Sequence, residues 1–313
     1  MFVALATNVL VTATKITAGV IGGSSAMLSE GAHSISDSVN ELFLVASIRR
    51  SERPADDRHP FGHGAERFFW SLLAAVGIFL AGGGFSLFQA YRAFTTPERA
   101  GHWALEYAVL GISGAFEGVS LFRAVHQIRE EARSAGREAI EHIAKSADPA
   151  LKTVAFEDSI AVFGVTVAAT GIALHQITHD GRWEGVASAI IGVLLIVAAF
   201  ALARDNMSLL IGESIEPARA ARIRDTIASH PMVDEVIELL TRYLGAHEVL
   251  VAARVKLVDG LNSDQIERMS SDIDARLRAL DPEITQVFID PTAPEERPST
   301  GTEQREHREQ RAS

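Results

Sequence analysis

The sequence predicts an α-helical membrane protein with six transmembrane helices and a C-terminal cytoplasmic α+β domain. Two observations predict it. Six segments each hold about 20 mostly apolar residues, the length that crosses a bilayer core. After Arg204 these runs stop, and the pattern becomes that of a small soluble domain. The averages of 47% hydrophobic residues and a net charge of −11 describe neither part of the chain.

The predicted spans follow one another along the first two thirds of the chain. They are Phe2 to Ile21, Met27 to Ile48, Phe68 to Phe94, Trp103 to Phe122, Val154 to Ile177 and Trp183 to Ala203. The first run lacks a basic segment before it and a cleavage motif, so we expect a span and not a removable signal. Lys and Arg concentrate in the links after spans two and four, which predicts that both termini are cytoplasmic.

The C-terminal segment has the order helix, strand, strand, helix, strand, which predicts a two-layer αββαβ domain. The expected elements are Glu216 to His230, Val233 to Tyr243, Val249 to Val258, a helix starting near Asn262 and Gln265, and Ile284 to Ile289. We therefore expect a six-span domain at 1–212, an α+β regulatory or dimerisation domain at 213–292 and a disordered tail at 293–313. The tail is rich in Pro, Glu, Arg, Gln and Ser and has too few apolar residues to form a core.

The second span carries a polar stripe. On a helix its members lie within an arc of about 100°; they are Glu30, His33, Asp37, Asn40 and Glu41. Ionisable groups at bilayer depth normally face a bundle interior or a wet cavity. His33 and Asp37 are spaced i, i+4 and can reach one divalent ion; the alternative is a polar cluster that joins helices. Glu30 and Glu41 lie nearer the helix ends, where water or headgroups are their simplest partners.

Other spans contribute further charged side chains. Glu157 and Asp158 lie near the cytoplasmic end of span five, and adjacent residues diverge by about 100°, so they need not face one site. An interfacial pair is the alternative. Glu117 in span four either lines the same cavity or is neutralised by protonation. Lys15 in span one is its possible counter-ion, with snorkelling to the interface as the alternative.

The link after span two contains Asp56, His59 and His63. The two histidines are again i, i+4, and three N or O ligands within eight residues can hold zinc without cysteine. The alternative is that these residues shape the loop and pack it on the soluble domain.

The absence of cysteine excludes disulfides, thiol nucleophiles and thiolate metal sites. An acidic chain offers no basic stripe for nucleic acid. The sequence contains neither a phosphate-binding loop nor a nucleophile elbow, so it gives no support for a hydrolase or transferase.

Four stretches resemble the cation diffusion facilitator family of divalent metal transporters, and the match covers residues 1 to about 292. The stretches are Ser29 to Asp37, Pro54 to Gly64, Glu157 to Ser159 and Leu209 to Glu213. The resemblance implies a homodimer whose cytoplasmic domain is ferredoxin-like, folded like a metallochaperone. It also implies that His33 and Asp37 form half of a four-ligand transport site.

The resemblance assigns the other half of that site to span five, where this chain departs from the pattern. Asp158 matches one ligand, but Val154 stands where the other would be. Glu157 can substitute, Asn40 can join from span two, or water can complete three protein ligands. The Glu-Asp pair resembles a divergent branch of the family.

The resemblance also implies a second metal site at Asp56, His59 and His63. Relatives carry binuclear sites in the soluble domain that use several histidines. Here that domain has His230 and His247, and Phe288 occupies a position where histidine would be expected, although Asp290 matches. We therefore predict that the soluble-domain site is missing.

The function predicted from these residues is export of a divalent cation from the cytoplasm by proton antiport and alternating access. Zinc comes first, with Mn²⁺, Fe²⁺ and Co²⁺ as alternatives. A His/Asp site must lose protons to bind a dication, and His33 is of the residue type that changes charge near neutral pH. We expect no cofactor, and as partners membrane lipid, metal ions and a second copy of the chain, in the cell membrane of a bacterium. The alternative is a non-transporting metal sensor or scaffold. A carrier of organic cations would need more aromatic residues beside the acids.

Overall fold

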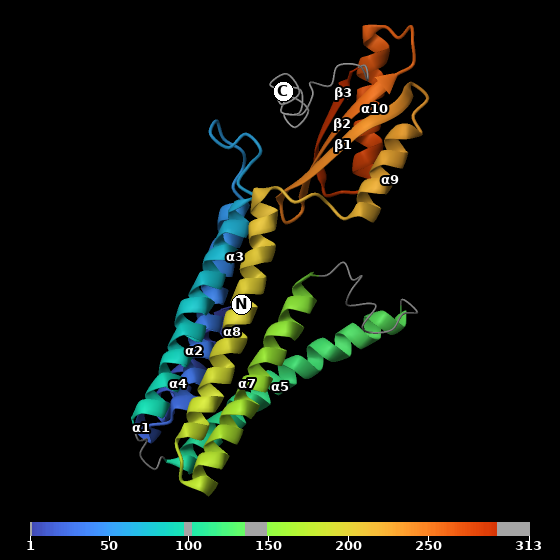
Figure 1. Cartoon of the computed structure of the whole chain (residues 1–313). Coiled ribbons are helices and arrows are strands. Elements are labelled where there is room, and N and C mark those ends of the chain that lie inside the picture. Colours follow the sequence, from blue (N-terminus) through green and yellow to red (C-terminus); the bar gives the residue numbers. More distant parts are fainter. Residues whose placement is uncertain (1, 97–101, 135–148, 293–313) are drawn as a thin grey trace, which may run out of the picture. The chain divides into compact units, whose positions relative to one another are not determined.

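The computed structural model describes the backbone of residues 2–96, 102–134 and 149–292, and the predicted tail at 293–313 lies outside them. The chain divides into two compact units (Figure 1). The first contains residues up to Ser47 together with Phe69–Met207, and the second contains Ile48–Phe68 together with residues from Ser208 onward. The predicted domain boundaries stay predictions, but the loop after the second helix belongs to the same unit as the C-terminal domain.

The first unit is a bundle of long helices that coincide with the six predicted spans (Figure 1). Their bounds are α1 Phe2–Gly22, α2 Ser25–Ser51, α3 Glu66–Gly77, η1 Ile78–Gly84, α4 Phe85–Thr95, α5 Trp103–Ser134, α7 Pro149–Thr178 and α8 Arg182–Ile211. Four helical stretches are long and apolar enough to cross a membrane: Glu66–Thr95, Trp103–Glu130, Glu157–Thr178 and Arg182–Ile211. The polar stripe lowers the hydropathy of α2, and the described apolar part of α1 is the shorter Asn8–Gly22. The prediction of six spans is therefore only partly confirmed.

The third predicted span is not a uniform α-helix, because the π-helical segment η1 joins α3 to α4. Two of its glycines pack very closely against other helices. A Cβ atom added to Gly82 would lie 2.6 Å from Ser36 Oγ of α2, and one added to Gly83 would lie 2.5 Å from a side-chain carbon of Ile196 in α8. Small residues at helix contacts allow this approach. A π-turn cannot be seen in hydropathy alone, and such turns are frequent at functional sites.

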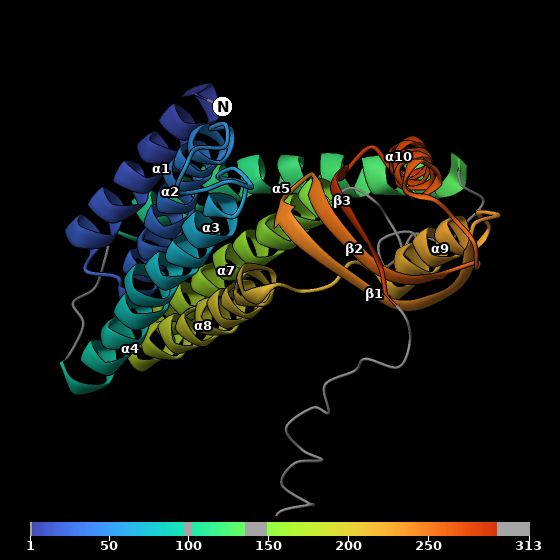
Figure 2. The same ribbon diagram turned by 90° about the horizontal axis from the view of Figure 1, so that it is seen from above.

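The C-terminal domain has the predicted order of elements. They are α9 Pro217–Ala228, β1 Val233–Gly245, β2 Glu248–Leu257, α10 Ser263–Leu280 and β3 Ile284–Pro291. The sheet order is β1-β2-β3, with β1 and β2 antiparallel and β2 and β3 parallel. Both helices pack on the sheet and on each other (Figure 2). This confirms a small two-layer α+β domain.

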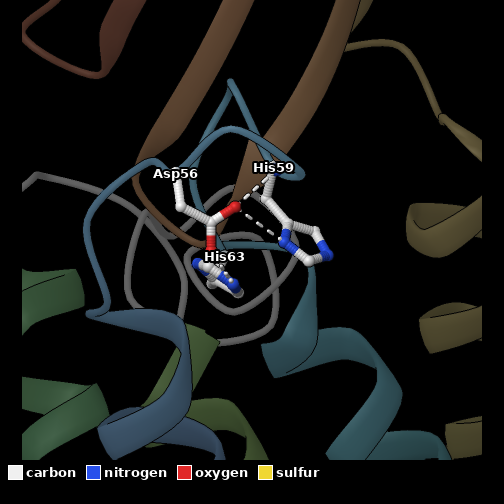
Figure 3. Close-up of side chains that lie close together, drawn as sticks. All are labelled: Asp56, His59 and His63. Carbon is white, nitrogen blue, oxygen red and sulfur yellow. Dashed lines mark hydrogen bonds and ion pairs between the residues drawn. The ribbon is translucent and has the colours of Figure 1, made fainter.

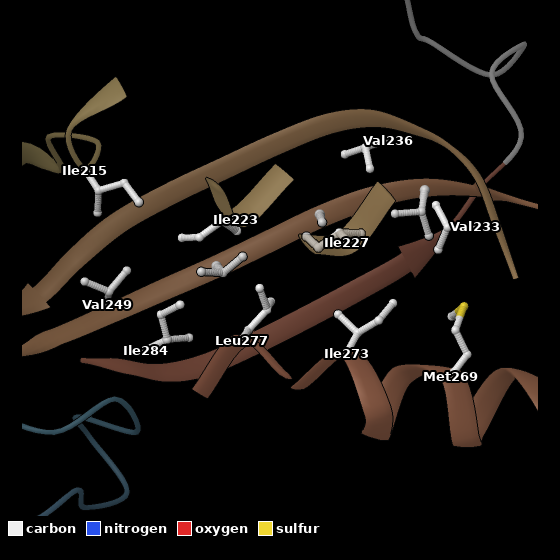
Figure 4. Packing of buried hydrophobic residues seen from close by; sticks show 13 residues of the cluster. Ile215, Ile223, Ile227, Val233, Val236, Val249, Met269, Ile273, Leu277 and Ile284 are labelled. Atoms are coloured by element: carbon white, nitrogen blue, oxygen red, sulfur yellow. The ribbon is translucent and has the colours of Figure 1, made fainter. Parts of the chain in front are cut away.

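The core of that domain lies between the sheet and the two helices (Figure 4). Strand β2 alternates as predicted, because Val249, Val251, Ala253 and Val255 are buried. From the helices come Ile223, Ile227, Met269, Ile273 and Leu277. Helix α10 begins with the expected cap: Asn262 Oδ1 accepts from the Gln265 backbone N–H, and Gln265 Oε1 accepts from the Asn262 N–H, each at 2.9 Å. This reciprocal capping box defines where the helix begins.

Candidate functional site

The predicted pair on α2 lies inside the bundle. His33 is 4% exposed, and its Nδ1 lies 3.6 Å from Asp37 Oδ1, which is longer than a hydrogen bond. Neither ring nitrogen of His33 has a hydrogen-bond partner among the described residues, although both are buried. Buried polar atoms are normally hydrogen-bonded, and one that is not requires an explanation such as a missing ion. The i, i+4 spacing therefore presents an imidazole and a carboxylate that are free to bind.

His33 and Asp37 line a cavity of about 250 Å³. Glu157 of α7 and Asp205 of α8 line it too, and the rest of the wall is apolar: Ile78, Ile160, Leu195, Ala198, Ala201 and Leu202. The Asp37 side chain is 40% exposed and Asp205 is exposed, so water reaches the acidic side of the cavity. One imidazole and three carboxylates from three helices surround this space, which suits a divalent cation.

Asn40 and Glu157 contact each other. The Asn40 amide donates to Glu157 Oε1 at 3.1 Å, and this contact joins α2 to α7. Glu157 thus lines the cavity with a hydrogen bond that orients its carboxylate, and hydrogen bonds of this kind orient the ligands in metal sites. The structure favours Glu157 as the substitute ligand and gives Asn40 a positioning contact.

Asp158, the residue that matches the family pattern, does not line the cavity. It accepts a hydrogen bond from the Ser120 hydroxyl of α5, while its Oδ2 has no partner among the described residues. Adjacent helical residues diverge by about 100°, which separates Asp158 from Glu157. The side chain of Val154 lies outside those that the structure describes. The ligand role of Asp158 stays a prediction that this conformation does not support.

The loop residues are much closer together than the cavity residues. Within the described part of the chain, Asp56, His59 and His63 are the one trio of potential ligands whose atoms all lie within 4.8 Å of one another (Figure 3). Asp56 Oδ1 lies 3.2 Å from His59 Nδ1, and Asp56 Oδ2 lies 3.5 Å from His63 Nε2. Three such ligands leave a fourth position for water or another group.

The backbone of the loop holds Asp56 in place. The N–H groups of His59 and Arg58 donate to Asp56 Oδ1 at 2.7 and 2.9 Å. These two hydrogen bonds lower the pKa of Asp56 below its ordinary value, and the one from His59 has the larger effect. The carboxylate is therefore charged and oriented over the whole neutral range. The expectation of a compact ligand trio agrees with this geometry.

The same loop packs on the C-terminal domain, within the second unit. A Cβ atom added to Gly64 would lie 2.6 Å from the Leu244 carbonyl oxygen in the β1–β2 region. Phe61 makes an edge-on contact with Phe288 of β3, with ring centroids 6.5 Å apart. Only a glycine permits the first contact. The two readings of the loop are thus compatible: it packs on the soluble domain and it gathers three ligands.

Comparison with known proteins fits this geometry. A family profile described as "Cation efflux transmembrane domain" matches residues 1–211, which is more than half of the chain. The chain belongs to the cation diffusion facilitator family. This confirms the family inferred from the four motifs.

Named relatives in the family differ in the metal that their names give. The mouse protein named "Proton-coupled zinc antiporter SLC30A9, mitochondrial" is 31% identical over 255 residues, 82% of this chain and 45% of its own length. "Manganese efflux system protein MneP" of Bacillus subtilis is 24% identical over 298 residues, 92% of this chain and 93% of its own. "Metal tolerance protein C4" of Arabidopsis thaliana is 28% identical over 242 residues, 77% of this chain and 53% of its own. The chain spans about half the length of the mouse and Arabidopsis relatives.

Beside the cavity, this family member has a buried ion cluster. Lys15 Nζ lies 3.1 Å from Glu30 Oε2 and 3.0 Å from Glu117 Oε1, so Lys15 is the counter-ion of Glu117 and does not snorkel. Glu30 is completely buried, which corrects the expectation that it meets water or headgroups. Glu41 also has a partner within the bundle, because one of its carboxylate oxygens accepts a hydrogen bond from the side-chain amide of Asn8 at 2.8 Å. Hydropathy could not show these contacts because they depend on the rotation of α1 against α2.

In the soluble domain, the residues near the family's other site position make ordinary ion pairs. His230 Nε2 lies 3.2 Å from Asp272, and His247 Nδ1 lies 2.9 Å from Glu283. Asp290 accepts from Arg254 at 3.0 Å, and Phe288 is half exposed. The prediction that this site is missing stays a prediction.

Proposed function

We propose that this protein exports a divalent cation, Zn²⁺ first, in exchange for protons. The observation that carries the proposal is the cavity lined by His33, Asp37 and Glu157, with both His33 ring nitrogens buried and without hydrogen-bond partners in the part of the chain that the structure describes. An imidazole and carboxylates bind zinc with water in a remaining position. Mn²⁺ is the strongest alternative, because three carboxylates favour a harder ion, and Fe²⁺ and Co²⁺ follow. The two named relatives, one for zinc and one for manganese, support both choices.

Proton exchange follows from the chemistry of the ligands. A dication and protons compete for the same imidazole and carboxylate atoms, so metal release and proton binding are linked. The ligand atoms in the cavity are not gathered as tightly as those in the loop, and loose preorganisation suits a site that must release its ion. The mouse relative, named a proton-coupled antiporter, supports this step.

The proposed setting is a bacterial cell membrane crossed by six spans, with both termini in the cytoplasm. The basic links after α2 and α5 support this orientation. Glu157 lies near the end of α7 that follows the basic link after α5, and Asp205 lies near the end of α8 that leads into the C-terminal domain, so the cavity would open to the cytoplasm in this conformation. We further propose a homodimer and no enzymatic activity or cofactor. Alternating access would rock the helices around the cavity.

The test uses two adjacent residues as a matched pair. In proteoliposomes, uptake of Zn²⁺, Mn²⁺, Fe²⁺ and Co²⁺ is measured for wild type, Glu157→Gln, Asp158→Asn and Asp37→Ala. Glu157→Gln and Asp37→Ala should lose transport, and Asp158→Asn should retain most of it. Full activity of Asp37→Ala would show that the cavity is not the transport site. If Asp158→Asn instead loses transport and Glu157→Gln retains it, Asp158 would be the ligand.

The second candidate is a non-transporting metal sensor or scaffold. It is favoured by the loop trio, whose ligand atoms are closer together than those in the cavity. Metal-dependent proton flux in proteoliposomes separates the two functions. Absence of flux with every metal, together with metal binding at the loop, would leave the sensor.

A further inference from the structure

A second buried polar cluster lies at the other end of the bundle. His175 near the end of α7 places Nδ1 2.6 Å from Glu184 Oε1 at the start of α8. Ser24, in the turn between α1 and α2, donates to the other oxygen of Glu184. His175, Glu184 and Ser24 are 6%, 3% and 2% exposed. The cluster therefore ties the α1–α2 turn to the α7–α8 turn, away from water.

Glu106 at the start of α5 adds a buried carboxylate to this end of the bundle. It is 1% exposed, and its Oε1 has no hydrogen-bond partner among the described residues. A Cβ atom added to Gly22 would lie 1.8 Å from that oxygen, so the carboxylate occupies the space beside the glycine at the end of α1. Glu184 and His175 lie within electrostatic range of Glu106. The unpartnered oxygen thus belongs to the same cluster.

The charges in this cluster are not balanced by a fixed cation. Within the described residues, neither Glu106 nor Glu184 pairs with Lys or Arg, whereas Glu30 and Glu117 both contact Lys15. The groups that face one another are Glu106 and Tyr107 from α5, His175 from α7 and Glu184 from α8, besides the uncharged Ser24. Two buried carboxylates without a cation are too costly to persist. Among the residues that the structure describes, no Lys or Arg supplies the positive charge, and protons are the source that we consider.

The cluster is far from the transport cavity but on the same helices. His175 follows Glu157 by 18 positions on α7, which corresponds to about 27 Å along the helix axis. Leu195 and Asp205, which line the cavity, follow Glu184 on α8. In this conformation the cavity has exposed carboxylates while the cluster is sealed. The two ends of the same helices are therefore in opposite states of access.

We propose that Glu106, His175 and Glu184 form a proton-binding site that closes this end of the bundle. Protons from the adjoining compartment neutralise Glu106 beside the contact between His175 and Glu184, which lets the turns pack together. Loss of these protons leaves like charges in apolar surroundings, and their repulsion and rehydration separate the turns. The role of this site rests on the proposed transport function, because closing this end of the bundle accompanies access to the cavity at the other end.

The test measures access to this end and needs no metal transport. The chain has no cysteine, so a single introduced thiol reports cleanly. Ser188→Cys, one turn after Glu184 and completely buried, is the reporter, and exposed Thr178→Cys corrects for the pH dependence of the thiol itself. The full-length protein in liposomes is labelled with a membrane-impermeant maleimide. The corrected rate should rise at least about tenfold between pH 6 and pH 8, the range in which histidine changes charge.

Charge-neutral variants distinguish proton binding from a passive contact. Glu106→Gln and Glu184→Gln mimic protonated carboxyls, and each should lower labelling at pH 8 and flatten the pH dependence. Asp180→Asn, an exposed carboxylate in the same turn, is the matched control and should behave as wild type. If one Gln variant does not fold, the other carries the test.

Two results would overturn the proposal: a wild-type labelling rate that does not change with pH, or Gln variants that retain the wild-type pH dependence. Either result leaves metal transport unaffected, so it would count against the proton site and not against export. Loss of transport in wild type with the expected labelling would count only against export.

Discussion

The cavity and the loop trio contain the same kinds of side chain, imidazole and carboxylate, in two different arrangements. In the cavity, His33 Nδ1 and Asp37 Oδ1 are 3.6 Å apart, their neighbours come from other helices, and neither imidazole nitrogen has a hydrogen bond to a described residue. In the loop, Asp56, His59 and His63 come from one short segment, and their ligand atoms lie within 4.8 Å of one another. Backbone N–H groups also orient Asp56. The proposed site in the cavity, assembled from several helices, is suited to releasing an ion, whereas the proposed site within one loop is suited to retaining one.

The largest expected effect is a difference in transport between a cavity variant and a loop variant. Asp37→Ala removes a charged ligand from a partly buried site, which costs about 3 kcal/mol and should lower transport by roughly a hundredfold. His63→Ala in the loop should leave most transport in place. Zinc flux into proteoliposomes measures both. Equal losses in the two variants would show that the loop is part of the transport path.

The next effect concerns affinity. His63→Ala should weaken metal binding at the loop by at least about tenfold, because even residues behind the ligands contribute that much. Isothermal titration of full-length protein carrying Asp37→Ala isolates the loop site. His230→Ala, which alters a histidine outside both sites, is the control. Unchanged binding in His63→Ala would mean that the trio only shapes the loop.

A smaller effect is expected on the metal preference of the cavity. His33→Asp replaces the nitrogen ligand with a harder oxygen ligand, so the ratio of Mn²⁺ to Zn²⁺ transport should rise by several-fold to about tenfold. Competition between the two ions in vesicle uptake measures the ratio. An unchanged ratio would count against His33 as a ligand.

The packing of the loop can be tested by adding one methyl group. Gly64→Ala would place Cβ 2.6 Å from the Leu244 carbonyl oxygen, so the loop must shift, at a cost of about 1–3 kcal/mol. Hydrogen exchange in residues 54–64 should become faster. Gly118→Ala in α5, where a Cβ meets open space, should produce no such change. Unaltered exchange in Gly64→Ala would disprove the close packing.

The smallest effect is the pH response of the loop. Asp56 has a pKa below its ordinary value of 3.8 because its charged form accepts the His59 and Arg58 N–H groups. A depressed folded-state pKa contributes order that is present above the ordinary value and lost as pH falls through the folded value. Exchange at the His59 and Arg58 amides should therefore show no Asp56-dependent change from pH 7 to pH 5 and should quicken below 3.8. In Asp56→Asn this acid step should vanish, and its persistence would exclude the carboxylate as its cause.

Local patterns predicted much of the fold. The Asn262–Gln265 capping box and the buried face of β2 depend on residues two to four positions apart, and both were read correctly from spacing. For Lys15 the sequence left two alternatives, a counter-ion of Glu117 or snorkelling, and the contacts in the bundle decide for the counter-ion. The π-helical turn at Ile78–Gly84 could not be predicted, because one widened turn leaves the apolar composition unchanged.

The site was less predictable than the fold because it depends on how helices rotate against one another. Spacing along α2 was enough to pair His33 with Asp37. The choice between Glu157 and Asp158 depends on the rotation of α7, which is determined by close contacts such as Gly164 against Glu30 and Gly171 against Ala187. Asp205 was missed because it follows the apolar run of span six, although α8 continues to Ile211. A charged residue just beyond a predicted span was the available signal.

The ion pair between Lys15 and Glu30 also bears on how the chain enters a membrane. Helix α2 is too polar to partition into lipid by composition alone, and a lysine near the middle of α1 is a further penalty of roughly 2.5 kcal/mol or more. Paired across the short α1–α2 turn, the two charges neutralise each other before either helix is left alone in hydrocarbon. The first two helices should therefore leave the translocation machinery together as a hairpin that carries His33 and Asp37, two of the proposed metal ligands.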